Sequence, residues 1–148
     1  VGALVGQKAT SQLKKCVLEL GGSDPFIVLE DANIEKAANG AVKGRFINCG
    51  QSCIASKRFF VSKKISNEFI ESFVKKASRL SVGDPMNIEN DLGPLVNKES
   101  FDNIAAIVND AKNKGAQILL GGSKIDGIGY YYQPTILTDV NLFHYILA

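Results

Sequence analysis

The sequence predicts an α/β fold built around a largely parallel sheet, and three observations support this class. Short apolar runs alternate with longer stretches whose apolar residues recur every three or four positions, which is the order of strands and helices around parallel sheets. Paired glycines, or glycine with aspartate and proline, separate these stretches as turns do. With 148 residues, 45% of them hydrophobic and 22% charged, the chain has the composition of a globular domain.

The chain opens with one predicted helix and two apolar runs. Ala3 to Lys15 is short on helix breakers and predicts a helix with a thin apolar stripe. Cys16 to Leu20 is an apolar run around a single acid, and Gly21-Gly22 stops it. Such a run suits a strand that is covered on both faces. Phe26 to Leu29 is the second run of this kind, so we expect two strands before the next helix.

A one-sided helix is predicted from Ile34 to Phe46. Either Asp31 or Asn33 could cap its first turn, because a side-chain oxygen there can accept a backbone N–H. Gly40 and Gly44 lie inside this helix, where glycine costs about 1 kcal/mol relative to alanine. We therefore expect both glycines to mark close packing against a neighbouring element.

The second half of the chain continues the alternation of strands and helices. Ser66 to Leu80 carries the clearest amphipathic pattern, and Asn97 to Lys114 predicts a further helix with Gly115 well placed to end it. The apolar runs between and after these helices predict strands at Arg58 to Ser62, Gln117 to Leu120 and Thr135 to Leu137.

Charge and composition exclude several classes of partner. Seventeen Lys and Arg against fifteen Asp and Glu give a net charge of +2, which is too small to predict nucleic-acid or membrane-surface binding. No apolar run approaches the roughly 18 residues of a membrane-spanning helix. Three cysteines without an export signal predict free thiols and a cytoplasmic location. The single histidine, His144, argues against a His-based catalytic dyad or a His-rich metal site.

The first candidate for chemistry is Cys53, which follows a helix and a small, polar segment beginning at Gly50. Nucleophiles are often presented on loops of this kind, although many free cysteines are simply buried in the core. Cys49 lies four residues earlier and could form a strained disulfide with Cys53 or half of a metal site. The metal alternative needs a second Cys or His pair, which the sequence does not offer.

The second candidate is Glu19, which stands between two leucines and before two glycines. Partial burial there would raise the pKa of its carboxyl and suit it to act as a base near neutral pH. The alternative is a glutamate on an edge strand that points into water. Since no histidine is placed to help, a thiol mechanism in this chain would have to use a carboxylate or water as its base.

Taken together, the two candidates lie in segments that resemble the two active-site motifs of the NAD(P)-dependent aldehyde dehydrogenases. Residues Glu19 to Pro25 (Glu-Leu-Gly-Gly-Ser-Asp-Pro) resemble the glutamate motif of that family. Residues Phe46 to Cys53 (Phe-Ile-Asn-Cys-Gly-Gln-Ser-Cys), with Arg58 five positions on, resemble its cysteine motif. The sequence as a whole is most similar to the bacterial succinate-semialdehyde dehydrogenase branch. Further landmarks that resemble the family are Gly83-Asp84-Pro85, Leu92 to Leu95, Gly115-Ala116 and Gln133-Pro134-Thr135.

The resemblance implies a covalent mechanism with NAD or NADP as cofactor and a small aldehyde as substrate. The Cys53 thiolate would attack the aldehyde carbon, and after oxidation a thioester would remain on Cys53. Glu19 would then activate the water that hydrolyses this thioester. The backbone N–H of Cys53 would supply one oxyanion donor. The resemblance also implies that Leu20 and Gly21 contact the cofactor, and that the protein forms a homo-oligomer.

The resemblance further predicts how the chain is divided. Residues 1–20 would be the end of a cofactor-binding domain, and residues 21–148 an incomplete aldehyde dehydrogenase catalytic domain. The family's phosphate-binding turn, its oxyanion asparagine and its ribose-binding lysine would precede Gly2, and the tail from Asn141 departs from the family pattern as a truncated or frame-shifted end would. We therefore expect little turnover from this chain alone. Ile47 stands where some succinate-semialdehyde enzymes carry arginine, so this position does not support a carboxylated substrate.

Two alternatives remain open at this point. The same Cys53 and Glu19 could acylate and deacylate as a cofactor-free thiol esterase. The chain could also be a folded remnant without enzymatic activity, whose open strand edges and uncovered apolar surface would lead to self-association.

Overall fold

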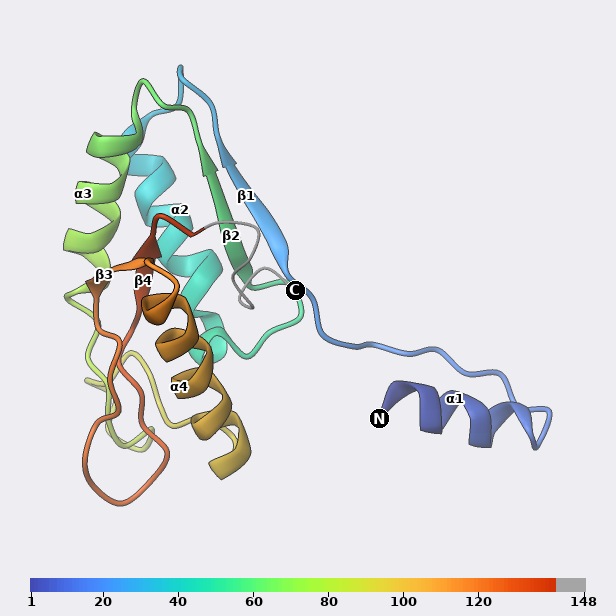
Figure 1. The fold of residues 1–148 in the computed structure, drawn as a ribbon. Helices are drawn as coiled ribbons and strands as arrows, with labels where there is room; N and C mark the ends of the chain where they lie inside the picture. Colours follow the sequence, from blue (N-terminus) through green and yellow to red (C-terminus); the bar gives the residue numbers. More distant parts are fainter. Residues whose placement is uncertain (141–148) are drawn as a thin grey trace.

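The structure is a computed structural model that describes residues 1–140. Two groups of elements follow an N-terminal helix that stands apart from them (Figure 1). The elements, in chain order, are α1 (Gly2–Thr10), β1 (Asp24–Val28), α2 (Ile34–Phe46), the 3₁₀ turn η1 (Ile47–Gly50), β2 (Ser56–Val61), α3 (Ser66–Ala77), α4 (Lys98–Asn113), β3 (Gln117–Leu120) and β4 (Ile136–Thr138).

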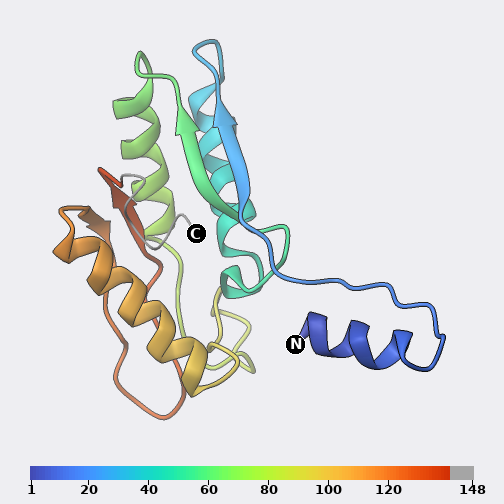
Figure 2. The same ribbon diagram turned by 45° about the vertical axis from the view of Figure 1, so that its right-hand side comes forward.

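The first group is a parallel pair of strands with two helices on one face. β1 and β2 pair in parallel, and α2 and α3 lie together on the same side of the pair (Figures 1 and 2). Asn33 caps α2, since its side-chain oxygen accepts the Lys36 N–H at 2.9 Å. A Cβ on Gly40 would lie 3.5 Å from the Phe26 ring, and one on Gly44 would lie 3.2 Å from the Ser56 hydroxyl. The predicted α/β class, the cap at Asn33 and the close packing of Gly44 are confirmed, whereas a Cβ on Gly40 would make only an ordinary contact.

Phenylalanines fill the space between this sheet and its helices. Phe73 on α3 has its ring centroid 5.1 Å from Phe59 on β2, 5.7 Å from Phe69 and 6.4 Å from Phe46 on α2. Phe73 is only 4% exposed, and Phe69 is buried as deeply. The three elements are therefore held by one aromatic cluster, which also supports the end of α2 from which the Cys53 loop departs.

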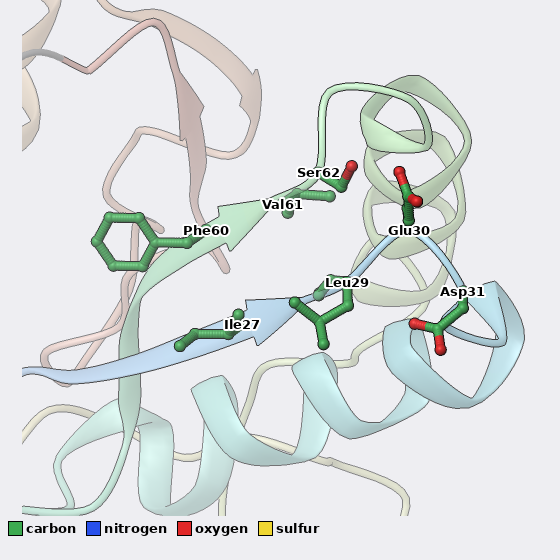
Figure 3. A pocket seen from close by; sticks show the side chains of 8 residues that line it. Ile27, Leu29, Glu30, Asp31, Phe60, Val61 and Ser62 are labelled. Atoms are coloured by element: carbon green, nitrogen blue, oxygen red, sulfur yellow. The ribbon is translucent and has the colours of Figure 1, made fainter.

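The opposite face of the β1–β2 pair is uncovered. Residues alternate along each strand, so Ile27 and Phe60 point away from α2 and α3 and are more than half exposed. An open hollow of about 720 Å³ lies over this face, and Glu30 and Asp31 border it where β1 ends (Figure 3). Cys53 is not among the residues that line the hollow.

The second group joins α4 to an antiparallel strand pair. β3 and β4 run antiparallel, which differs from the parallel arrangement that the alternating pattern favours. Residues 121–135 return as a hairpin-like loop, so the connection holds no crossover helix and the strands must reverse. α4 lies beside this pair in both views, with Val108 and Ala111 buried on its inner side (Figures 1 and 2).

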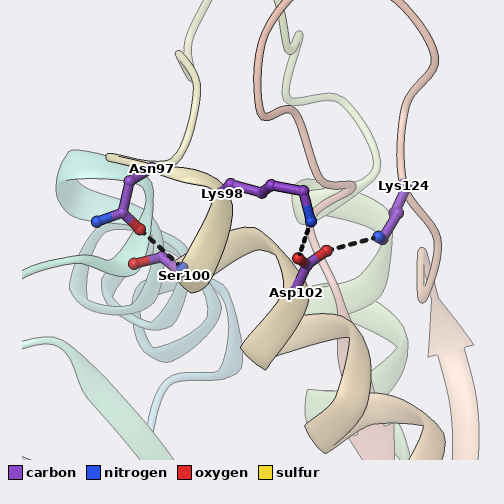
Figure 4. Close-up of polar contacts among 5 residues, drawn as sticks. All are labelled: Asn97, Lys98, Ser100, Asp102 and Lys124. Carbon is purple, nitrogen blue, oxygen red and sulfur yellow. Dashed lines mark hydrogen bonds and ion pairs between the residues drawn. The ribbon is translucent and has the colours of Figure 1, made fainter.

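Polar contacts fix the start of α4. Asn97 caps the helix by accepting the Ser100 N–H at 2.8 Å, and Asp102 receives both Lys98 and Lys124 (Figure 4). The Asp102 pKa is lowered, first by its hydrogen bond with Lys98 and then by the one with Lys124. Since Lys124 belongs to the loop between β3 and β4, this ion pair ties that loop to the helix.

The N-terminal segment departs most from the prediction. The helix expected to reach Lys15 ends at Thr10, and the strand expected over Cys16 to Leu20 does not form. Instead these residues run extended between α1 and β1, with Val17 90% exposed and Leu20 55% exposed (Figure 1). A strand requires a hydrogen-bonded neighbour, and none of the described residues lies beside this segment as one. The apolar run therefore stays in water.

Candidate active site

Cys53 lies on the loop between η1 and β2, and its side chain is exposed. Just before it the chain makes an unusual turn, because Asn48 (φ 48°), Cys49 (φ 57°) and Gly50 (φ 75°) all adopt left-handed backbone conformations. Only glycine tolerates this region freely, so the turn is strained at the two non-glycine residues. The turn ends α2 abruptly and sends the following residues outward. Burial of Cys53 in the core, the structural alternative, does not occur.

A neighbouring segment holds this loop from one side. The Cys49 thiol donates to the Gly93 carbonyl at 3.4 Å, and the Val96 N–H donates to the Gln51 side-chain oxygen at 2.9 Å. Both contacts come from residues 93–96, which precede α4. Cys49 is half-buried by this arrangement whereas Cys53 stays open, so the two thiols of the loop have different surroundings.

The side chain of Arg45, in the last turn of α2, also contacts this loop. Its Nη2 donates to the Gly50 carbonyl at 3.3 Å, and burial lowers the pKa of its guanidinium. The Nη1 atom is also buried and has no hydrogen-bond partner within residues 1–140. Arg45 therefore contributes one direct contact to the turn that precedes Cys53.

The glutamate segment meets the cysteine loop at Gly22. A Cβ at this position would lie 2.4 Å from the Cys53 carbonyl oxygen, so only glycine lets the two backbones approach this closely. Two cations of β2 support the contact, since Lys57 donates to the Gly22 carbonyl and Arg58 Nε donates to the Ser23 carbonyl at 2.9 Å. The fold thus brings together the two segments that the sequence singled out.

Glu19 itself lies on the exposed side of this meeting point. Its carboxylate is solvent-exposed and makes no hydrogen bond or ion pair with any described residue. The expected partial burial is wrong, because the strand predicted over Cys16 to Leu20 does not form and the segment that carries Glu19 is exposed. Leu20 and Gly21 are exposed as well, and a Cβ on Gly21 would meet nothing within 4 Å. The space above Gly21 is therefore open.

The backbone of Cys53 keeps a donor available. Its N–H makes no hydrogen bond to another described residue, whereas the neighbouring Ser52 carbonyl already accepts the Ala55 N–H at 3.1 Å. An unpaired N–H beside a nucleophile is the group that an oxyanion hole uses, since it can receive the negative oxygen of a tetrahedral intermediate. The exposed loop can therefore offer both a thiol and one such donor.

Metal-binding clusters and membrane-spanning helices are both absent from the described part of the chain. Within residues 1–140, no three side chains of His, Cys, Asp or Glu gather as a metal site would require. In the same part of the chain, no helix has the length and apolar character needed to cross a bilayer. His144 and the tail from Asn141 lie outside the described residues.

Sequence reasoning overlooked three contributors to the site. Gly22 was noted only as a strand stop, although the glycine pair was the available indication of a close backbone approach. Gln51 lies in the cysteine motif, but its partner Val96 is 45 residues later and nothing in the sequence links the two. Arg45 has the pattern of an ordinary cation at a helix end, so its burial could not be predicted.

Comparison with known proteins gives a consistent result. The model of the aldehyde dehydrogenase family matches residues 1–147. The chain is 50% identical over 139 residues to the succinate semialdehyde dehydrogenase [NAD(P)+] Sad of Escherichia coli K12, covering 94% of this chain and 30% of that protein. It is 48% identical over 139 residues to the succinate-semialdehyde dehydrogenase [NADP(+)] 1 of Mycobacterium ulcerans, again with 94% and 30% covered. The chain thus spans about 30% of the length of these relatives.

Solved structures resemble the fold equally well. Lactaldehyde dehydrogenase from Escherichia coli superposes with a TM-score of 0.93 at 35% identity, covering 99% of this chain and 31% of that one. Succinate-semialdehyde dehydrogenase from Burkholderia pseudomallei gives 0.91 at 34% identity, with 98% and 30% covered. The NAD+ complex of a Bacillus cereus aldehyde dehydrogenase gives 0.92 at 36% identity, with 99% and 30% covered. Because the family model matches residues 1–147, which is nearly the whole of this chain, the chain belongs to the aldehyde dehydrogenase family.

Proposed function

We propose that the chain supplies the nucleophile and the base for NAD(P)-dependent oxidation of a small aldehyde, with succinate semialdehyde as the substrate. The observation that supports the proposal is the contact between Gly22 and the Cys53 carbonyl, because it joins the glutamate segment to the loop that carries the exposed Cys53 thiol. Identities of 50% and 48% to succinate semialdehyde dehydrogenases support the choice of substrate.

In this proposal Cys53 forms and releases the covalent intermediate. Its thiolate sulfur bonds to the aldehyde carbon, and the carbonyl oxygen becomes an alkoxide that the Cys53 N–H can receive. A bound nicotinamide supplies the acceptor for the hydride that leaves this carbon. The carbon then carries a thioester to Cys53. The exposed position of Cys53 leaves room for the aldehyde to approach.

Glu19 is the proposed base for the second half of the reaction. Its carboxylate takes a proton from a water molecule as the water oxygen adds to the thioester carbon. The carbon–sulfur bond then breaks, the Cys53 thiolate is restored and the carboxylic acid leaves. Glu19 lies three residues before Gly22, so a short extended segment connects it to the point of contact with Cys53.

The cofactor is proposed to lie over Leu20 and Gly21. The space above Gly21 is open, since a Cβ there would meet nothing within 4 Å, and Gly21 comes one residue before the contact of Gly22 with Cys53. Leu20, 55% exposed, would offer an apolar edge to the same ring. The division into residues 1–20 and 21–148 belongs to the same proposal.

Replacing Glu19 by glutamine is expected to slow release of an acyl group from Cys53 by about tenfold, since the amide cannot accept the proton of water. The chain is first acetylated with p-nitrophenyl acetate, and loss of the acetyl group from the Cys53 peptide is followed by mass spectrometry. Glu71→Gln, which changes an exposed glutamate on α3, is the matched control. Equal deacetylation rates in all three proteins would remove Glu19 from the proposed mechanism.

The 148-residue chain alone is expected to give little NADH or NADPH from succinate semialdehyde. Its Glu19 to Gly21 segment is exposed and extended, so it does not enclose a bound cofactor or exclude water from the thioester. The formation of reduced cofactor is measured by absorbance with NAD and with NADP. Robust aldehyde-dependent reduction by the purified chain would contradict this expectation.

The alternative, a folded and self-associating module without enzymatic activity, is supported by a separate observation. Ile27 and Phe60 expose an apolar sheet face, and the β1–β2 pair has unpaired strand edges among the described elements. The same features fit assembly into a homo-oligomer. A cytoplasmic location is proposed from the three cysteines, all of which are free.

A further inference from the structure

Arg45 is the one buried side-chain group within residues 1–140 that has an unpaired polar atom. Its Nη2 binds the Gly50 carbonyl at 3.3 Å, while the buried Nη1 has no partner in this part of the chain. Burial lowers the pKa of the guanidinium, because removing a charge from water disfavours the charged form. A methionine or leucine could occupy the same space without that cost. The arginine is therefore better explained by what it does than by packing.

The position of Arg45 reduces the cost. It lies in the last turn of α2, where the negative end of the helix dipole favours a cation. From there its side chain lies under the turn of Asn48, Cys49 and Gly50, whose left-handed conformations need an outside constraint. A guanidinium is suited to this task, because it is rigid and carries several donors in a fixed plane.

Gly50 is fitted to the guanidinium. A Cβ on Gly50 would lie 2.0 Å from Nη2 of Arg45 and 3.2 Å from the Arg45 carbonyl oxygen. The loop backbone and the arginine therefore pack directly on each other, with no space for a side chain between them. In the sequence Cys49 precedes Gly50 and Cys53 follows it. Cys49 is half-buried against Gly93, whereas Cys53 is exposed.

We propose that Arg45 is a positioning residue for the nucleophile loop. By holding the Gly50 carbonyl it keeps the turn closed, which retains Cys49 against Gly93 and leaves Cys53 as the only thiol that the loop presents. Without Arg45 the turn relaxes, Cys49 becomes accessible, and the two thiols compete. The inference rests on the proposed role of Cys53 as the nucleophile.

The test compares the accessibility of individual cysteines in Arg45→Met, Arg45→Lys and the wild-type chain. Each protein is treated with iodoacetamide, and alkylation of each cysteine is followed by peptide mass spectrometry. Cys16 is exposed on the N-terminal segment and serves as the internal standard. Arg79→Met, which changes an exposed arginine after α3, is the matched control.

In Arg45→Met the ratio of Cys49 to Cys16 alkylation is expected to rise about tenfold, because the loop loses its donor. In Arg45→Lys we expect a smaller rise of this ratio, about threefold, since a single ammonium group replaces the several donors of the guanidinium only in part. Arg79→Met should match the wild type. Circular dichroism checks that each variant is folded. If Arg45→Met does not fold, the test rests on the alkylation ratio of Arg45→Lys. An unchanged ratio in the folded variant would overturn the positioning role.

The readout separates this inference from the proposed function. Alkylation reports where the thiols lie and requires neither aldehyde nor cofactor. If Cys53 fails to accept an acyl group while the Cys49 ratio rises, the proposed function fails and the positioning role stands. If Cys53 is acylated while the ratio stays constant in both Arg45 variants, the positioning role fails and the nucleophile stands.

Discussion

Replacing Cys53 by alanine is expected to lower acetyl transfer from p-nitrophenyl acetate to the loop by at least about a hundredfold, because the variant has no sulfur there to form the thioester. In the wild-type chain the thiolate attacks the ester carbon, p-nitrophenolate leaves, and acetate remains bonded to sulfur. The exposed thiol and the unpaired N–H of the same residue favour this site for the reaction. The measurement is the rate of p-nitrophenolate release under excess ester, together with location of the acetyl group by mass spectrometry.

Cys16→Ala is the matched control for this experiment. Cys16 is also exposed but lies on the extended segment between α1 and β1, outside the loop that carries Cys53. We expect its removal to leave acetylation of the loop unchanged. If Cys53→Ala and Cys16→Ala reduce the release of p-nitrophenolate to the same small extent, the reaction is that of any exposed thiol, and both the nucleophile and the thiol-esterase alternative lose their support.

The elements that could be predicted from the sequence are those whose partners lie close by in the chain. The strand at Gln117–Leu120 and the helix after Asn97 agree with the structure because a cap, a terminal glycine and an apolar stripe are local features. Gly115, with φ of 97°, ends α4 as its position indicated. The Cys53 loop was found in the same way, because a glycine after a helix marks where the helix must stop.

The errors have a different origin. Cys16 to Leu20 has the composition of a buried strand, yet a strand also needs neighbours, and among residues 1–140 none pairs with it. The prediction that Glu19 is partly buried failed for the same reason. Arg45 was overlooked because burial of a charge depends on how the chain folds back at Gly50, which composition does not record. The geometry of the site therefore depends on long-range contacts that the motifs alone do not specify.

The second large effect concerns the aromatic cluster beneath the site. Phe73→Ala is expected to cost about 3–5 kcal/mol of unfolding free energy, because the truncation leaves a cavity where four rings meet. Phe73 is 4% exposed, and its ring lies near those of Phe59, Phe69 and Phe46. Stabilities of single domains are only about 5–15 kcal/mol, so this loss is a large share of the total. The free energy is measured by urea denaturation, followed by circular dichroism.

Phe60→Ala is the matched control, since it removes the same side chain from the uncovered face of β2, where Phe60 is 52% exposed. We expect it to cost less than about 1 kcal/mol, because an exposed ring leaves no cavity when it is removed. Equal losses in the two variants would mean that Phe60 is covered in solution, as self-association through the open sheet face would require. In that case the loss of stability in Phe60→Ala should depend on the protein concentration at which the denaturation is repeated. A small loss in Phe73→Ala alone would contradict the packing of α3 against β2.

Since the same cluster holds the end of α2, Phe73→Ala should also loosen the Arg45 contact and raise alkylation of Cys49 before the chain unfolds as a whole.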